Sequence, residues 1–365
     1  MTELSRVTVV LPSLDPDEKL NAVIRGLLDQ GFSDIVLVND GSKQENLHYF
    51  TEAAQHPQVT LLHHPENRGK GAALRTAFRY VLENRRSSLG VVTVDGDGQH
   101  HSEDTAACAR HMLETGKLTL GVRDFSLPEI PGRSRMGNRI TSLVFKIFVG
   151  MTIADTQTGL RAIPQKDLAP LADIAGDRFE YETNMLLAMK NLEIPFDQVK
   201  IRTVYIEENK SSHFRAVRDS WRIYKLILAH FFKYTGSSLL SSVVDEGLFL
   251  LLTWALTGVL TGFAFKAVPV LVARVLSSLL NFYMNQKLVF KSKLPSRTSL
   301  WRYFLLAVAV GLGQMVLTFG ICTVLHIQDT QLVAQGIVYA VVMTLLFMVS
   351  FLAQQRWVFA GKKSN

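Results

Sequence analysis

Short apolar runs alternate with longer amphipathic stretches over residues 7–206. This alternation is typical of β-α units arranged around a mainly parallel sheet. The pattern predicts strands at residues 7–11, 34–38, 59–62, 89–94 and 118–122. It predicts helices at residues 17–30, 70–83 and 102–115. Because ligands of such sheets bind outside the carboxyl ends of the strands, we expect the chemistry in the residues that follow each strand.

The pattern changes in the second half of the chain, where four long apolar segments follow one another at residues 239–263, 268–290, 300–325 and 333–359. Each is long enough to cross about 30 Å of hydrocarbon. Basic residues follow the second and fourth segments, whereas the other two loops hold only Lys266. By the positive-inside rule, we expect a multi-pass protein of the cytoplasmic membrane with both termini in the cytoplasm.

Between the two halves, apolar and basic residues recur at helical spacing from residue 214 to residue 233. This pattern predicts a basic amphipathic helix that lies in an anionic membrane interface. An ordinary surface helix is the alternative. We therefore expect an α/β domain at residues 1–210, an interface helix at 211–235 and an all-α membrane domain at 236–365.

The membrane half contains a weak internal repeat. Residues 281–290 read NFYMNQKLVF and residues 350–359 read SFLAQQRWVF, and each stretch closes the second helix of a predicted hairpin. The repeat predicts two hairpins related by a parallel repeat. We also expect that this domain can form homo-oligomers.

Composition narrows the function further. The chain has a net charge of +7 and 48% hydrophobic residues, but only three of its 32 acidic residues lie beyond residue 236. The basic residues concentrate beside apolar helices and do not interleave with aromatic residues, so we expect no nucleic-acid partner. The two cysteines, Cys108 and Cys322, fall in different halves, which makes a disulfide framework implausible.

Two carboxylate motifs follow predicted strands. Asp40 lies in VNDGS, after the second strand, where a carboxylate can reach a nucleotide. Asp95 and Asp97 alternate in VDGDGQH, after the fourth strand, and Gln99 continues the alternation. Hard oxygen ligands at this spacing suit a divalent cation that bridges a diphosphate. A plain turn is the alternative for both motifs.

Two further segments have the chemistry of phosphate binding. NRGKGA, from Asn67 through Lys70 and Gly71, is glycine-rich and opens a helix, so its amides and its lysine can meet a phosphate, although loop flexibility also explains it. A basic cluster surrounds a proline-glycine loop and a helix expected from Met136 that carries Asn138. Arginine suits phosphate because its guanidinium binds two oxygens at once. The cluster comprises Arg123, Arg133, Arg135 and Arg139.

In order and spacing, these motifs resemble the family 2 glycosyltransferases that make polyprenyl-phosphate sugars, the dolichyl-phosphate mannose synthase and bactoprenol glucosyltransferase group. The resemblance runs over about residues 5–215 and includes VVLPSLDPDEKL, DTQTGLRAI and SSHF. Residues 235–360 resemble a GtrA-like membrane domain, through the two repeat endings and Asp245. The resemblance implies an α/β GT-A, Rossmann-like domain followed by four transmembrane helices.

The resemblance also implies roles for individual residues. The nucleotide sugar is expected at Pro12, Leu14, Asp40, Asn67, Lys70, Gly71 and Asp95. Mg²⁺ or Mn²⁺ is expected at Asp95, Asp97 and Gln99. The acceptor phosphate is expected at Arg123, Arg135, Asn138 and Arg139, with Asp95, Asp97, Arg123 and Arg135 as the catalytic set. The residues expected to line the acceptor side are Asp155, Gln157, Arg161, Glu182, Ser212 and His213.

The implied reaction is an inverting transfer of a hexose from a nucleotide sugar to undecaprenyl or dolichyl phosphate at the cytoplasmic membrane face. UDP-glucose is the first expected donor and GDP-mannose the second. Two alternatives remain. One is a processive polysaccharide synthase, whose Gln-x-x-Arg-Trp motif is absent from the sequence. The other is a lipid-linked sugar flippase or membrane organiser with an inactive transferase domain.

Overall fold

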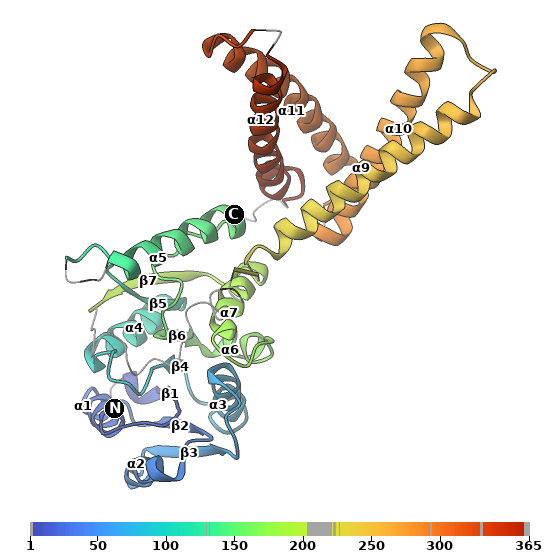
Figure 1. The fold of residues 1–365 in the computed structure, drawn as a ribbon. Helices are drawn as coiled ribbons and strands as arrows, with labels where there is room; N and C mark the ends of the chain where they lie inside the picture. The colour runs from blue at the N-terminus through green and yellow to red at the C-terminus, as the bar shows by residue number, and fades with distance from the viewer. Residues whose placement is uncertain are drawn as a thin grey trace. The chain divides into compact units, whose positions relative to one another are not determined.

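The computed structural model describes residues 3–128, 130, 132–202, 221, 224–225, 227–292, 294–328 and 331–360. The chain divides into two compact units, Met1–Ile227 and Leu228–Asn365. Each unit has its own architecture: the first contains the sheet, and the elements described in the second are helices (Figure 1).

The first unit is built on a seven-stranded mixed sheet with the order β3-β2-β1-β4-β6-β5-β7. Strands β1, β2, β3 and β4 are mutually parallel, β6 runs antiparallel to both of its neighbours, and β7 is parallel to β5. Parallel neighbours place their carboxyl ends at one edge, which is where a ligand site is expected. The strands are β1 (Val7–Ser13), β2 (Ile35–Asp40), β3 (Val59–His64), β4 (Gly90–Thr93), β5 (Leu118–Arg123), β6 (Arg161–Pro164) and β7 (Phe196–Ile201).

Helices cover both faces of this sheet, because successive strand residues point to opposite sides. Val10 of β1 belongs to one hydrophobic cluster, whereas its neighbours Val9 and Leu11 belong to another. The first cluster packs the sheet against α3 (Lys70–Asn84), α6 (Gln165–Ala172) and α7 (Glu180–Asn191). The second packs it against α1 (Lys19–Asp29), α2 (Leu47–Ala53) and α4 (Ser102–Thr115). Strands β1, β2 and β4 are buried on both faces. Because neither face meets water, their sequences are largely continuous apolar runs.

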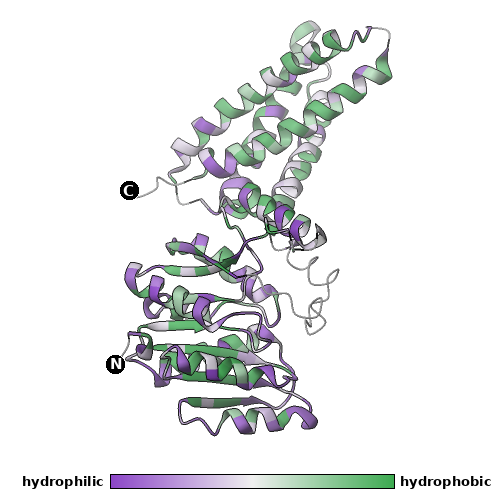
Figure 2. Cartoon of the chain, turned by 90° about the vertical axis from the view of Figure 1, so that its left-hand side faces the viewer, coloured by the Kyte–Doolittle hydropathy of each residue, from purple (hydrophilic) through white to green (hydrophobic). Residues whose placement is uncertain are grey.

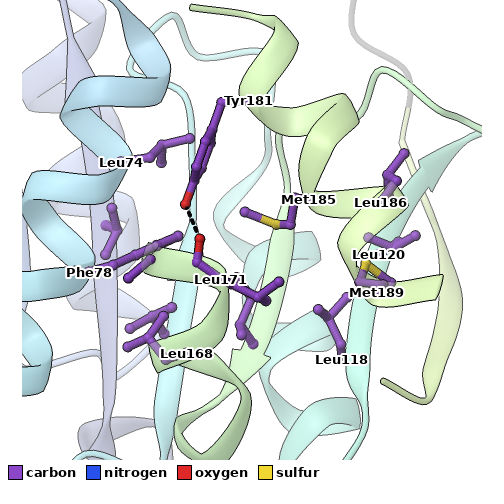
Figure 3. Packing of buried hydrophobic residues seen from close by; sticks show 14 of the residues in the cluster. Leu74, Phe78, Leu118, Leu120, Leu168, Leu171, Tyr181, Met185, Leu186 and Met189 are labelled. Atoms are coloured by element: carbon purple, nitrogen blue, oxygen red, sulfur yellow. Dashed lines mark hydrogen bonds between the residues drawn. The ribbon is translucent and has the colours of Figure 1, made fainter. Parts of the chain in front are cut away.

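A tyrosine ties two helices of the first cluster together. Tyr181 of α7 is fully buried, and its hydroxyl donates a 2.6 Å hydrogen bond to the carbonyl of Leu171 in α6 (Figure 3). Burial raises the pKa of Tyr181 well above its usual range. The hydrogen bond gives a buried polar group the partner that it needs, and it holds the start of α7 next to α6.

All five predicted strands and the three predicted helices are present, and the predicted α/β fold is confirmed. Four strands extend further than predicted: β1 ends at Ser13, β2 at Asp40, β3 at His64 and β5 at Arg123. Asp40 and His64 are buried and hydrogen-bonded to each other, which hydropathy alone does not reveal. The helix expected from Met136 is α5 (Gly132–Val144).

The described residues of the second unit include four membrane-length helices, as predicted. These are α9 (Ala229–Ala255), α10 (Gly262–Met284), α11 (Ser296–Val324) and α12 (Leu332–Ala353). The segments long and apolar enough to cross a membrane are Phe231–Ala255, Gly262–Val289, Ser296–Val324 and Leu332–Val358. Figure 2 shows apolar residues along all of them. The first begins earlier than the expected residue 239, and the preceding interface helix at 211–235 lies largely outside the described residues.

The two repeat endings have matching structures. Each forms a single π-helical turn, at Asn285–Val289 and at Gln354–Val358. In each turn a backbone N–H donates to the carbonyl five residues earlier, at 2.8 and 2.9 Å. The side chains that open the two turns also meet, because Asn285 Nδ2 donates to Gln354 Oε1 at 3.0 Å. The two copies of the internal repeat therefore form a pair of π-helical turns that are hydrogen-bonded to each other through Asn285 and Gln354.

Candidate active site

Several of the predicted site residues lie at the carboxyl edge of the sheet. Asp40 and Arg123 end the strands β2 and β5, and Asp95 follows β4 by two residues. Strand β6 runs in the opposite direction and begins at Arg161, so the segment that precedes β6 lies at the same edge of the sheet. Residues far apart in the sequence are thereby gathered at one place.

A lysine bridges two carboxylates in the centre of this edge. Lys70 Nζ lies 2.7 Å from Asp95 Oδ1 and 3.0 Å from Glu182 Oε1. Burial opposes the charge on Lys70, but the two carboxylates outweigh it and raise the lysine pKa above its usual range. Burial likewise opposes ionisation of Asp95, but Lys70 and His100 hold the pKa of that carboxyl well below its usual range. Lys70 and Asp95 are therefore both charged at neutral pH.

Asp97 stands in a different environment. Burial and the charge of Asp95 raise the pKa of Asp97, and its carboxylate accepts a hydrogen bond from the backbone N–H of Gln99, at 3.0 Å. The described residues include no group of three or more His, Cys, Asp or Glu side chains that could by itself hold a metal ion. Asp95 and Asp97 nevertheless fit Mg²⁺ or Mn²⁺, which accept ligands from a few carboxylates together with substrate phosphates. A divalent cation there would also relieve the repulsion between the two carboxylates.

A histidine that the sequence did not single out adjoins the same carboxylate. His100 Nε2 lies 3.7 Å from Asp95 Oδ2, and the side chain is 8% exposed. Its Nδ1 atom is buried without a hydrogen-bond partner among the described residues. A buried, unpartnered ring nitrogen is uncommon, and here it lies beside the carboxylate pair.

Gly159 also supports the carboxylate centre, and sequence analysis missed it. A Cβ at this position would lie 2.6 Å from Asp95 Oδ2 and 3.0 Å from Lys70 Nζ. Only glycine therefore leaves room for the ion pair. The available indication was its place in DTQTGLR, the segment that enters β6.

Asp40 organises the glycine-rich loop. Its carboxylate is 3% exposed and accepts hydrogen bonds from the backbone N–H groups of Arg68, at 3.0 Å, and Gly69, at 2.7 Å. His64 Nδ1 lies 2.7 Å from the same carboxylate, and His64 Nε2 lies 2.9 Å from Thr76 Oγ1. Asp40 thus holds the glycine-rich loop at the end of β2. Hydropathy and motif spacing did not predict this structural role. Its expected contact with the nucleotide stays a prediction.

Two other residues of the glycine-rich loop have different environments: Gly71 is packed against α7, and Asn67 is exposed. A Cβ on Gly71 would lie 2.5 Å from Tyr181 Cβ, so this glycine allows α3 to approach α7 closely. Asn67 is exposed, as a residue available to a ligand would be. The nucleotide roles expected for both residues remain predictions.

Hydrogen bonds beyond Pro12 and Leu14 join the loop that follows β1 to the loop that follows β2. Pro12 is buried in β1, and Leu14 follows the strand half-buried. Asp15 then donates its backbone N–H to Ser42 Oγ at 2.8 Å and accepts at Oδ1 from the backbone N–H of Lys43, also at 2.8 Å. Asp15 and Ser42 were not predicted, and they hold together the loops that follow β1 and β2.

Arg123 is held by Asp155. Its Nε donates to Asp155 Oδ2 at 2.7 Å and its Nη2 donates to Oδ1 at 3.2 Å, and the Asp155 side chain is fully buried. Two parallel bonds fix the guanidinium plane. Asp155 Oδ1 also accepts from the backbone N–H of Gln157, whose side chain is exposed. The pair orients Arg123 at the end of β5.

The predicted acceptor residues on α5 contact neighbouring loops. Arg135 Nη2 donates to the carbonyls of Leu127, at 2.8 Å, and Ile130, at 3.4 Å. Asn138 Nδ2 donates to the carbonyl of Ala154 at 2.7 Å. Within the described residues, the buried atoms Arg135 Nε and Asn138 Oδ1 have no hydrogen-bond partner. Both side chains therefore retain capacity for a polar ligand.

The remaining predicted residues differ in their exposure to solvent. Arg139 is exposed on α5. Arg161 is 1% exposed, and its guanidinium donates to the carbonyls of Thr158, at 3.1 Å, and Glu182, at 2.8 Å. Arg161 therefore braces the loop before β6 against α7. Ser212 and His213 lie outside the described residues.

Family models match both units of the chain. Residues 8–166 match the family described as glycosyl transferase family 2, and residues 233–359 match the GtrA/DPMS transmembrane domain. Dolichyl-phosphate beta-glucosyltransferase ALG5D from Trichomonas vaginalis is 32% identical over 225 residues, which cover 56% of this chain and 67% of that relative. The chain belongs to glycosyltransferase family 2.

Two further glycosyltransferases are also similar to this chain. UDP-N-acetylglucosamine--dolichyl-phosphate N-acetylglucosaminyltransferase from Methanococcus voltae is 25% identical over 222 residues, covering 55% of this chain and 86% of the relative. Undecaprenyl-phosphate mannosyltransferase from Micrococcus luteus is 29% identical over 162 residues, covering 43% and 65%. The predicted family, its GT-A fold and its enzyme class are thereby confirmed, and the glycosyltransferase is a multi-pass membrane protein.

Proposed function

We propose that the chain transfers a hexose from a nucleotide sugar to a polyprenyl phosphate at the cytoplasmic face of a membrane. The observation that carries this proposal is the carboxylate pair Asp95 and Asp97, with Lys70 bound to Asp95, at the carboxyl edge of a GT-A sheet. The same chain contains four membrane-length helices, as an enzyme with a lipid acceptor would need.

The three relatives support the acceptor more strongly than the donor. Each of their names contains a polyprenyl phosphate, either dolichyl or undecaprenyl. Their sugars differ: one name gives glucose, one mannose and one N-acetylglucosamine. We therefore keep UDP-glucose as the first donor to test, followed by GDP-mannose and UDP-N-acetylglucosamine.

In the proposed reaction, a phosphate oxygen of the acceptor attacks the anomeric carbon of the sugar and inverts its configuration. A carbon–oxygen bond forms to the acceptor, the bond to the donor diphosphate breaks, and the nucleoside diphosphate leaves with the electron pair. A phosphate monoester has a second pKa of about 6, so it is largely a dianion at neutral pH and needs no general base. Glu182 fits this scheme because it is paired with Lys70 rather than available as a base.

The protein then has two main tasks: it positions the acceptor phosphate against the sugar, and it neutralises the charge of the donor diphosphate. Asp95 and Asp97 would hold Mg²⁺ or Mn²⁺, with Gln99 beside them, and a bound divalent cation supplies neutralisation of the diphosphate. Arg123, oriented by Asp155, and Arg135 would hold the acceptor phosphate. The unpartnered Arg135 Nε and Asn138 Oδ1 support a polar ligand at α5.

The test offers membranes that contain the full chain a panel of the three nucleotide sugars with undecaprenyl phosphate, dolichyl phosphate or free polyprenol. Lipid products are identified by mass spectrometry. We expect a hexosyl phosphate lipid from a phosphate acceptor and none from the free alcohol. Arg135→Ala should raise the acceptor KM, whereas Arg110→Ala, on the exposed surface of α4, should not.

Two results would count against the proposal. Equal use of free polyprenol would point to a hydroxyl acceptor and a base-catalysed reaction. Absence of turnover with every donor, from a chain that binds nucleotide sugar, would favour the flippase or organiser alternative.

A further inference from the structure

An ammonium group already occupies one of the two carboxylates that would hold the divalent cation. Lys70 Nζ lies 2.7 Å from Asp95 Oδ1, and its charge also acts on Asp97. The other oxygen, Asp95 Oδ2, lies close to Gly159, where a Cβ would approach it to 2.6 Å, and 3.7 Å from His100 Nε2. Any cation bound to Asp95 would therefore share that carboxylate with a positive charge.

Two positive charges beside one carboxylate repel each other strongly where water is partly excluded. The side chains of Lys70 and Asp95 are 18% and 28% exposed. The effective dielectric constant at such a place is well below that of water, so this repulsion exceeds a tenfold step in affinity. Within the described part of the chain, no cluster of three His, Cys, Asp or Glu side chains could hold a metal ion instead. The protein by itself is therefore a weak site for a divalent cation.

Glu182 gives the lysine a second partner. Glu182 Oε1 lies 3.0 Å from Lys70 Nζ, and the glutamate side chain is 11% exposed. The backbone of Glu182 is held in α7, because its carbonyl accepts a 2.8 Å hydrogen bond from the buried Arg161 Nη1. Asp95 lies instead in the loop that follows β4. Lys70 can therefore leave Asp95 and keep a carboxylate partner on a helix.

The start of α3 fixes the position from which Lys70 reaches both carboxylates. Lys70 is the first residue of α3, and Gly69 before it donates its backbone N–H to Asp40 Oδ2 at 2.7 Å. A Cβ on Gly71, the residue after it, would lie 2.5 Å from Tyr181 Cβ. These contacts hold the backbone on both sides of the lysine. A change of partner therefore requires movement of the lysine side chain alone.

A donor diphosphate would change the balance between lysine and cation. Mg²⁺ in proteins usually binds through one or two carboxylates together with substrate phosphates. The diphosphate would supply these missing ligands to the cation. Its remaining oxygens would accept hydrogen bonds from the ammonium group of Lys70, since lysine binds phosphate as a point charge. The donor would thus compensate Lys70 for the loss of Asp95.

We propose that Lys70 is an intramolecular competitor of the divalent cation, so that the cation binds Asp95 and Asp97 only together with the donor diphosphate. When both arrive, the ammonium group turns from Asp95 to a diphosphate oxygen and stays paired with Glu182, its positioning residue. The cation site itself rests on the proposed function, whereas the competition rests on the two ion pairs of Lys70. Cation and donor then bind cooperatively in both directions.

The test measures Mn²⁺ binding to the full chain in detergent micelles by electron paramagnetic resonance, at one neutral pH. Samples contain UDP, GDP or no nucleotide, and protein-free mixtures of Mn²⁺ and nucleotide give the background. We expect the wild type to bind Mn²⁺ at least about tenfold more tightly with UDP or GDP than without a nucleotide. By reciprocity, Mn²⁺ should tighten nucleotide binding by the same factor.

Lys70→Met gives the sharpest comparison. The competing charge is removed and Asp95 and Glu182 are left without it, so Mn²⁺ should bind the nucleotide-free variant at least about tenfold more tightly than the wild type. Mn²⁺ should also raise the unfolding temperature of this variant above its value in EDTA. Removal of a lysine with a purely structural role would not tighten cation binding. Lys190→Met, at an exposed position of α7, is the matched control and should bind Mn²⁺ as the wild type does.

Glu182→Gln should act in the opposite direction, and it leaves the pair of Lys70 and Asp95 in place. Without Glu182, the ammonium group has no second carboxylate to stay with when the cation displaces it. In the presence of nucleotide, Mn²⁺ should therefore bind this variant about 3–10-fold more weakly than the wild type. This variant also tests the proposal if Lys70→Met fails to fold. Glu114→Gln, exposed on α4, is its control.

Three outcomes would overturn the inference. They are equal Mn²⁺ binding by the wild type with and without nucleotide, no tighter binding by nucleotide-free Lys70→Met, or unchanged binding by Glu182→Gln with nucleotide. Sugar transfer by the wild type is measured separately. A chain that transfers sugar while Lys70→Met binds Mn²⁺ no more tightly disproves the competition and leaves the proposed function intact. A chain that shows the tighter binding but transfers no sugar supports the competition and contradicts the proposed function.

Discussion

Lys70 and Asp95 form a 2.7 Å ion pair at the carboxyl edge of the sheet, and Glu182 binds the same ammonium group from α7. Lysine was expected to meet donor phosphate. Here it neutralises one of the two carboxylates that were expected to hold a metal ion. The glycine-rich loop and the carboxylate motif are therefore parts of one electrostatic centre.

Lys70→Met should destabilise the first unit. The substitution removes the charge that compensates Asp95 and Glu182, and breaking a buried ion pair costs about 3–5 kcal/mol. Because the three side chains are 11–28% exposed, we expect a loss near 3 kcal/mol. For a unit of this size, that lowers the unfolding temperature by about 6–12 °C in a thermal scan. Lys190→Met, at an exposed position of α7, is the control, and an equal shift in both variants would refute the account.

Asp97→Asn should abolish transfer and raise the stability of the donor-free enzyme. Activity should fall more than about a hundredfold, because a ligand of the proposed cation is lost. In EDTA the unfolding temperature should rise, since the pKa of Asp97 is raised by burial and by Asp95. An acid with a raised folded pKa destabilises the fold when ionised, so the advantage of the variant should shrink as pH falls through that pKa.

The control for this variant is Asp29→Asn, at an exposed position of α1. It should change neither the activity nor the unfolding temperature. EDTA should also silence the wild type until Mg²⁺ or Mn²⁺ is restored. Full activity in EDTA would exclude a divalent cation from the reaction.

Glu182→Gln should leave the pH dependence of transfer unchanged. The acid limb of the rate profile should follow ionisation of the acceptor phosphate, at a pKa of about 6, in both enzymes. The variant should lose part of its activity, because Lys70 keeps only Asp95 as a partner. Rates measured against pH with saturating donor test this expectation. A folded, donor-binding variant that is inactive at neutral pH would instead identify Glu182 as a catalytic base.

Cys108 should resist modification in the folded enzyme. Its side chain is fully buried in α4, and burial raises the pKa of the thiol to about 12. The thiolate is the reactive form, so maleimide at mildly alkaline pH should not label Cys108 until the unit is unfolded. Labelling is followed by mass spectrometry in a Cys322→Ser background. Rapid labelling of the folded protein would show that α4 opens readily from the sheet.

Much of the architecture could be predicted from the sequence. Buried parallel strands are recognisable as continuous apolar runs, and the four membrane spans are recognisable by their length. Asp95, Asp97 and Arg123 could be named as candidates because each follows or ends a strand. Strand β6 was missed, since four buried residues carry no periodicity, and so was α7, which places Glu182 at the site.

The sequence by itself determined which residue types stand at the ends of the strands and where the chain becomes apolar enough for a membrane. Only the tertiary structure decided which charges meet. Lys70, Asp95 and Glu182 come from three elements, and their pairing depends on the sheet order and on the space left by Gly159. The pairing of Asp245 with Arg274 likewise depends on the packing of α9 against α10. Local patterns report periodicity along one segment, whereas ion pairs between segments follow from topology and close packing.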